Sequence, residues 1–127
     1  MNASEHHRET KERWGDTDAY QESARKTKNY SSEDFALANK EATEIVQDFI
    51  DAMVAGLSPE SVQAATAAEA HRRHITKWFY TCTYEIHVGL AQMYLADERF
   101  TQHYESQQVG LAKYVHDAIL ANAVDKG

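Results

Sequence analysis

Apolar residues recur three and four positions apart along most of this chain, which is the spacing of one face of an α-helix. One such stripe runs through Phe35, Ala38, Ala42, Ile45, Val46, Phe49 and Met53. Another marks the last predicted helix, with Leu111, Tyr114, Val115, Ala118, Ile119 and Ala123 on one side. Runs of Val, Ile and Thr that alternate with polar residues are missing, so strands have little to be built from. The pattern predicts an all-α fold.

Capping residues divide this pattern into helices. Ser31 followed by Asp34 resembles a capping box and opens the long helix, which we expect to end at Gly56. Ser58 followed directly by Pro59 indicates the start of the next helix. That helix is alanine-rich and extends to about residue 74. The helix that follows is either continuous with it or separated from it by a break near Lys77.

Two shorter elements complete the prediction. Asp16 or Thr17 can cap a short helix that runs through Tyr20 to about Lys28. Asp97 can cap a short turn through residue 100.

The segment 78–100 carries the most informative pattern, because two stripes share one predicted helix. Its apolar stripe is Phe79, Cys82, Ile86, Leu90 and Met93. A second stripe, displaced by roughly a quarter turn, is Tyr80, Tyr84, His87 and Tyr94. Tyrosine and histidine side chains are largely apolar but end in a polar group, so they suit a surface in partly solvated contact with either another helix or a bulky ligand. Gly89, which costs about 1 kcal/mol relative to alanine inside a helix, allows another surface to come close.

The N-terminal part differs in composition from the rest. A chain of 127 residues is expected to form one domain. Its first 30 residues hold few large apolar groups, chiefly Trp14, Tyr20 and Tyr30. Such a segment gains little free energy from docking unless these aromatic rings find a partner. We therefore expect residues 1–30 to form a loosely held, lid-like helical segment on a core of residues 31–127.

Charge and composition exclude several classes of protein. The net charge is −7 and the 13 basic residues are scattered, which disfavours nucleic-acid binding by this chain. A single cysteine cannot form an internal disulfide, which is typical of a reducing cytoplasm. No apolar run approaches the roughly 20 residues of a membrane span, and no hydrophobic signal region opens the chain. We predict a cytoplasmic protein, monomeric or weakly dimeric, that uses no membrane and no cofactor.

Two residue sets could carry catalysis or bind a metal. His71 and His74 lie three apart on one helix and could bind a metal with His87, but no supporting carboxylate can be assigned to them. Cys82, Glu85 and His87 are residue types of a nucleophile system, yet their helical spacing does not let them converge. A small metal enzyme or hydrolase stays an alternative, and an analysis of bound metal would test it.

Several ordered motifs resemble the TipA-type antibiotic-recognition domain over residues 13–124. They are Trp14-Gly15, Thr17-Asp18-Ala19-Tyr20, Lys28-Asn29-Tyr30-Ser31, Glu69-Ala70-His71-Arg72, Tyr80-x-Cys82-x-Tyr84-Glu85-x-His87, Met93-Tyr94, Asp97-Glu98-Arg99-Phe100-Thr101 and Asp117-Ala118-Ile119-Leu120-Ala121-Asn122-Ala123. The resemblance implies a globin-like helical bundle that binds large, rigid, aromatic antibiotics such as thiopeptides between its helices. It also implies an N-terminal segment that becomes ordered over the ligand. In this family the domain is usually the effector-binding part of MerR-type activators and also occurs alone.

Two departures from the family pattern change what it implies. The DNA-binding part of the regulators is absent, so the chain is either free-standing or part of a longer protein. Thiopeptide-capturing members carry two cysteines two turns apart, and Gly89 stands where the second, to which covalent capture is assigned, would be. Cys82 matches the first. We therefore expect non-covalent binding of a small-molecule or peptide antibiotic, without catalysis.

The expected ligand contacts come from both stripes, the preceding helix and the lid. They are Trp14, Tyr20, His71, Phe79, Tyr80, Cys82, Tyr84, His87, Gly89, Met93 and Tyr94. Each of the stripe residues has the alternative of packing helix on helix, and Cys82 is as well explained as a core residue. His87 is either a pH-sensitive ligand donor or a hydrogen-bonded interior imidazole, of which the second is the more common role for a histidine.

Overall fold

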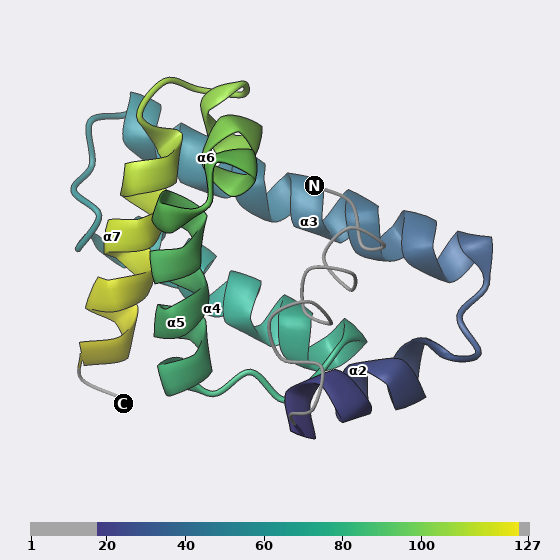
Figure 1. Ribbon diagram of the computed structural model, residues 1–127. Helices are drawn as coiled ribbons and strands as arrows, with labels where there is room; N and C mark the ends of the chain where they lie inside the picture. Colours follow the sequence, from purple (N-terminus) through teal and green to yellow (C-terminus); the bar gives the residue numbers. More distant parts are fainter. Residues whose placement is uncertain (1–17, 125–127) are drawn as a thin grey trace.

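The computed structural model describes residues 18–124, and every regular element in that range is a helix, which confirms the all-α prediction (Figure 1). The helices are α2 (Asp18–Thr27), α3 (Ser32–Val54), α4 (Val62–Trp78), α5 (Tyr84–Ala96), α6 (Glu98–Glu105) and α7 (Leu111–Val124). Trp14 and the expected cap at Asp16 or Thr17 lie outside the described residues.

The predicted ends of α3 are confirmed. The Ser31 hydroxyl accepts a hydrogen bond from the Asp34 amide at 3.1 Å, and the Asp34 carboxylate accepts one from the Ser31 amide at 2.9 Å. This reciprocal capping box satisfies two amides that the helix leaves without internal partners. After α3, the chain turns at Gly56, whose φ of 78° suits a residue without a Cβ.

The predicted start of α4 was wrong by three residues. Ser58 and Pro59 form a turn, in which the Ser58 hydroxyl accepts from the Glu60 amide at 2.9 Å. The helix begins at Val62, because Ser61 takes the N-cap position and accepts from the Ala64 amide.

The single predicted helix over residues 78–100 was also wrong. Residues 79–83 form a loop between α4 and α5, so Phe79, Tyr80 and Cys82 are loop residues. Thr83 caps α5 by accepting from the Ile86 amide at 3.2 Å. The run of aromatic and β-branched residues before it has weak helix propensity, while threonine is a good N-cap, so the chain breaks here. Asp97 caps α6 as expected, but α6 is a helix of eight residues and not a short turn.

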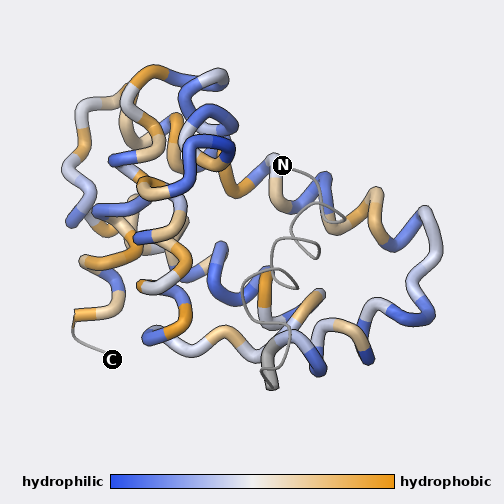
Figure 2. The backbone as a smooth tube through the Cα atoms, viewed as in Figure 1, coloured by the Kyte–Doolittle hydropathy of each residue, from blue (hydrophilic) through white to orange (hydrophobic). Residues whose placement is uncertain are grey.

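The core lies where α5 packs against α7 and α3 against α4, while α4 also contacts α7 (Figure 1). In Figure 2 apolar segments gather where α5 and α7 run side by side. The predicted inner face of α7 is buried along its whole length. On α5, however, Leu90 is buried on the same inner side as His87 and Tyr94, whereas Ile86 and Met93 stay partly exposed. The two stripes were therefore not separate faces of one helix.

No helix of the described part is long and apolar enough to cross a membrane.

Candidate functional site

Helix α2 is held against the end of α4 and the loop that follows it. The Glu22 carboxylate accepts from the Thr81 amide at 2.8 Å and from its hydroxyl at 3.0 Å. These hydrogen bonds, with that to the amide foremost, lower the pKa of Glu22. Beyond α2, the Tyr30 hydroxyl donates to the Trp78 carbonyl at 2.6 Å, and the two rings pack edge to face. Residues 20–30 thus contact the same end of the core that carries the predicted site.

A charged network fixes the geometry of that end. Arg72 on α4 donates to both carboxylate oxygens of Glu69, at 3.1 and 2.6 Å, and to the Cys82 carbonyl at 2.8 Å. Asn122 on α7 donates to Glu69 at 3.1 Å. The Arg72 guanidinium, more than any other partner, holds the pKa of Glu69 well below its usual range. The carboxylate therefore stays ionised and joins α4, the loop and α7.

Tyr84, the first residue of α5, lies over this network. The guanidinium carbon of Arg72 is 4.3 Å from the centre of the Tyr84 ring, a cation–π contact. The Tyr84 side chain is half-buried. Arg72 thus contacts the ring of a side chain that stays partly exposed.

His71 and His87 meet between α4 and α5. His71 Nδ1 lies 2.8 Å from His87 Nε2, and the rings are inclined by only 22°. His87 is fully buried, and burial lowers its pKa to about 4. His71 is half-buried and also packs against Phe49 and Tyr94. His87 thus supports His71, which has the more accessible ring of the two.

Tyr94 on α5 packs against His71 and belongs to a buried aromatic cluster. Its ring packs on Phe100 and Tyr104 of α6, with centroid distances of 5.4 Å in both cases. Burial raises the pKa of Tyr94 and that of Tyr104, so both phenols are neutral. Phe79 and Tyr80 are buried as well, at 3% and 0% exposure. These five rings all belong to the buried core.

Cys82 is buried in the loop. Its thiol lies 3.8 Å from the Thr83 carbonyl, and burial raises its pKa to about 12. A thiol in this state carries almost no thiolate and is a poor nucleophile. Of the two roles that the sequence left open for Cys82, ligand contact and core packing, its burial favours core packing.

Gly89 and Met93 lie on the more open side of α5. A Cβ built at Gly89 would meet no heavy atom of the described structure within 4 Å. Of the two surfaces that could come close to Gly89, a helix or a ligand, no helix of the described residues does so. The open space beside Gly89 could be occupied by a ligand. Met93 lies half-buried one turn further along α5, and its flexible side chain can adapt to the shape of a bound molecule.

The histidines predicted as an alternative metal site are used differently. His74 binds the Ala38 carbonyl through Nε2 at 2.8 Å, away from the His71–His87 contact. Within residues 18–124, no three His, Cys, Asp or Glu side chains are grouped so that they could hold a metal ion. The Cys82–Glu85–His87 set likewise forms no hydrogen-bonded series among these residues, since His87 bonds to His71 and Cys82 contacts the Thr83 carbonyl.

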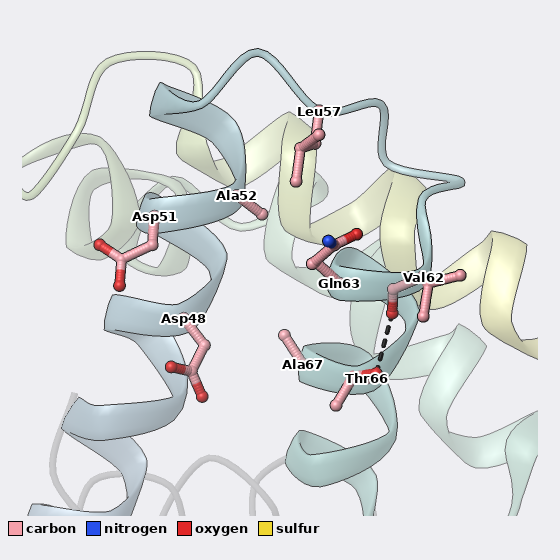
Figure 3. A pocket seen from close by; sticks show the side chains of 8 residues that line it. All are labelled: Asp48, Asp51, Ala52, Leu57, Val62, Gln63, Thr66 and Ala67. Atoms are coloured by element: carbon pink, nitrogen blue, oxygen red, sulfur yellow. Dashed lines mark hydrogen bonds between the residues drawn. The ribbon is translucent and has the colours of Figure 1, made fainter.

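A separate hollow of about 480 Å³ lies between α3 and α4 (Figure 3). Ala52 and Ala67 face each other across it, Leu57 lies above, and Asp48 is at its α3 edge (Figure 3). None of the predicted site residues lines this hollow, so its residues can serve as a negative control when ligand contacts are mapped.

The structure brings His71, His87 and Tyr94 into contact, and Arg72 joins the Tyr84 ring to the Cys82 carbonyl. Phe79 and Tyr80 are buried in the loop beside Cys82, Gly89 and Met93 lie on α5 and Tyr20 lies on α2, while Trp14 is outside the described range. Sequence reasoning missed Arg72, Glu69, Asn122 and Glu22 as site-forming residues. Glu69 and Arg72, three apart on a helix, were a detectable ion-pair signal. The partners of Asn122 and Glu22 lie more than 50 residues away along the chain, and no local pattern indicates them.

The model of the TipAS antibiotic-recognition domain matches residues 6–122 of this chain. The chain belongs to the TipAS antibiotic-recognition domain family. The HTH-type transcriptional activator TipA of Streptomyces coelicolor is 47% identical over 116 residues, which are 91% of this chain and 46% of TipA. The HTH-type transcriptional activator mta of Bacillus subtilis is 33% identical over 79% of this chain and 38% of its own length. This TipAS domain thus spans less than half of these curated relatives.

Two solved structures share the fold. The complex of nosiheptide with TipAS from Streptomyces lividans has a TM-score of 0.86 at 44% identity, covering 98% of this chain and 87% of that one. The antibiotic-binding domain of a TipA-class multidrug resistance regulator has a TM-score of 0.65 at 45% identity, covering 69% and 94%. The resemblance seen in the sequence is confirmed, and so is the helical fold that it implied.

Proposed function

We propose that this TipAS domain binds bulky aromatic antibiotics of the thiopeptide class, without covalent capture, at the wall formed by the end of α4, the loop and α5. The observation that carries the proposal is the likeness to the nosiheptide complex, which extends over 98% of this chain. The wall offers ring faces for stacking and a few polar tips for directional hydrogen bonds. Rigid aromatic ligands suit such a wall, because they lose little conformational entropy on binding.

The site residues divide into two layers by burial. We assign direct contact with the ligand to the accessible group, which is Tyr20, His71, Tyr84, Gly89 and Met93, together with Trp14 from the N-terminal segment. The buried group positions this surface from behind and consists of Phe79, Tyr80, Cys82, His87 and Tyr94.

We propose that the domain acts in the cytoplasm without catalysing a reaction. It would protect the cell by sequestering the antibiotic and so lowering the concentration of free drug. Occupancy then depends on the protein concentration relative to the dissociation constant. The buried thiol and the paired histidines supply no activated nucleophile.

A second candidate function is effector sensing within a longer MerR-type regulator. It is favoured by one specific observation, since TipA and mta are both transcriptional activators of which this chain spans 46% and 38%. An upstream in-frame helix-turn-helix in the gene would establish this role and defeat the free-standing one.

Isothermal titration calorimetry with nosiheptide tests the binding proposal. The wild type should bind, and Tyr84→Ala should weaken binding at least tenfold with helicity unchanged by circular dichroism. Val62→Ala is the control, because Val62 is 78% exposed at the α3–α4 hollow and should leave the affinity unchanged. No binding heat for the wild type would refute the proposal.

A further inference from the structure

The hollow between α3 and α4 has an apolar interior. The buried side chains of Ala52 on α3 and Ala67 on α4 face each other across it, and Leu57 from the connecting loop lies above them (Figure 3). Alanine on both helices leaves the space between them unfilled. The volume of about 480 Å³ lies within the range of sites that bind small molecules.

The α3 rim of the hollow carries negative charge. Asp48 and Asp51 lie three residues apart on α3, on neighbouring turns of one face, and both are exposed. Gln47 donates to one oxygen of Asp51 at 2.8 Å, which leaves the charge of the carboxylate in place. None of the eight described residues that line the hollow is Lys, Arg or His, so the lining supplies no counter-charge. Like charges on neighbouring turns repel each other, and a cation beside them would relieve the repulsion.

The α4 side of the hollow is uncharged. Val62, Gln63 and Thr66 are exposed there, and the Thr66 hydroxyl donates to the Val62 carbonyl at 2.8 Å. The Thr66 oxygen can still accept a hydrogen bond from a ligand N–H group. The hollow therefore combines an apolar interior with negative charge on one side only.

We propose that this hollow is a second ligand site, separate from the antibiotic wall, and that it binds a small organic cation with a flat aromatic body, such as an arylalkylammonium ion. The aromatic ring lies between Ala52 and Ala67, and the ammonium group lies at the α3 rim against Asp48 and Asp51. Burial of the ring supplies most of the binding free energy, and the two carboxylates select the charge.

Other small ligands fit this lining less well. The two carboxylates would repel an anion. Within residues 18–124 no three His, Cys, Asp or Glu side chains are grouped to hold a metal ion, so a bare divalent cation lacks ligands. A neutral apolar molecule would partly desolvate the carboxylates without pairing with them.

The first test is an NMR titration of the ¹⁵N-labelled protein with 4-phenylbutylammonium. Amide shifts should concentrate in residues 48–52, at Leu57 and in residues 62–67. The neutral counterpart 4-phenylbutanol should bind about fivefold more weakly, because it has the same ring but no charge for the carboxylates. No shifts in the hollow at millimolar ligand, shifts confined to residues 84–93, or equal affinity for the alcohol would overturn the proposal.

The second test removes the two charges. Asp48→Asn/Asp51→Asn should weaken binding of the cation about fivefold and leave the affinity for the alcohol unchanged. Glu33→Gln/Glu85→Gln is the control, since it removes two charges from the first turns of α3 and α5, outside the hollow. This control should keep the wild-type affinity. An equal loss in both double variants would show attraction to the net charge of the protein and refute a site at the hollow.

Two further measurements separate this site from other occupants. Hollow amides of the ligand-free protein should not shift on dilution, whereas concentration-dependent shifts there would show that a second copy covers the hollow and would overturn the proposal. Nosiheptide added to protein saturated with the cation should leave the shifts in the hollow in place, and displacement of the cation would contradict two separate sites. Failure of nosiheptide to bind would refute the antibiotic proposal alone.

Discussion

Arg72 and Tyr84 are in direct contact, with the guanidinium carbon 4.3 Å from the centre of the tyrosine ring. The same guanidinium donates to Glu69 and to the Cys82 carbonyl. One side chain therefore fixes the break between α4 and α5 and the orientation of the ring that we assign to ligand contact.

Replacing Arg72 by Gln should lower the free energy of unfolding by about 2 kcal/mol, because Glu69 would keep a largely buried charge without its main partner. Urea denaturation measures this change. Arg73→Gln is a matched control: Arg73 also bonds to Glu69, but its side chain is 76% exposed, and its loss should cost less than about 1 kcal/mol. Equal effects of the two variants would contradict the positioning role of Arg72.

Gly89→Ala should raise the free energy of unfolding by up to about 1 kcal/mol, since alanine favours the helix and the added methyl meets no described neighbour. Thermal denaturation without ligand measures the change. A loss of stability would show that the space beside Gly89 is closed in solution.

Native Cys82 should resist iodoacetamide at about pH 8, because its thiol is buried and its pKa is raised to about 12. Mass spectrometry should find the native protein unmodified and the urea-unfolded protein alkylated. It should also find no covalent adduct between the wild type and nosiheptide.

Gly89→Cys provides the accessible thiol that the wild type lacks. We expect it to be alkylated quickly and, following the cysteine that capturing family members carry here, to form an adduct with nosiheptide. Rapid alkylation of Cys82 in the folded wild type would contradict the buried geometry.

The sequence predicted those features that local signals specify. Ser31 and Asp34 marked the start of α3, and the spacing from Leu111 to Ala123 marked the buried face of α7. It did not predict the loop at residues 79–83, because helical periodicity continues across the break and outweighed the capping signal of Thr83. It offered a hydrogen-bonded interior imidazole as one of two roles for His87, but it did not place Tyr94 in the interior, since which stripe faces the core depends on how α5 meets α4 and α7.

The domain should lose stability as the pH falls below about 6.5, the ordinary histidine pKa. The pKa of His87 is lowered to about 4 in the folded state, so the unfolded state binds the proton first and acid favours unfolding. This single group should cost about 3 kcal/mol between neutral pH and pH 4.

Protonation of Glu69 should lower the stability further at still lower pH. The pKa of Glu69 is lowered in the folded state, so its ion pair with Arg72 stabilises the fold only while the carboxylate is ionised. Urea denaturation at several pH values measures the dependence. Stability that is constant or increasing from pH 7 to pH 5 would contradict the burial of a neutral His87.

Mapping nosiheptide on the ¹⁵N-labelled protein by NMR tests the central claim most directly. We expect the largest amide shifts from residues 84–93 of α5, around His71 and at Tyr20, with residues 48–52 at the α3–α4 hollow almost unchanged. Absence of shifts at saturating ligand, or shifts confined to the hollow, would contradict the proposed binding wall.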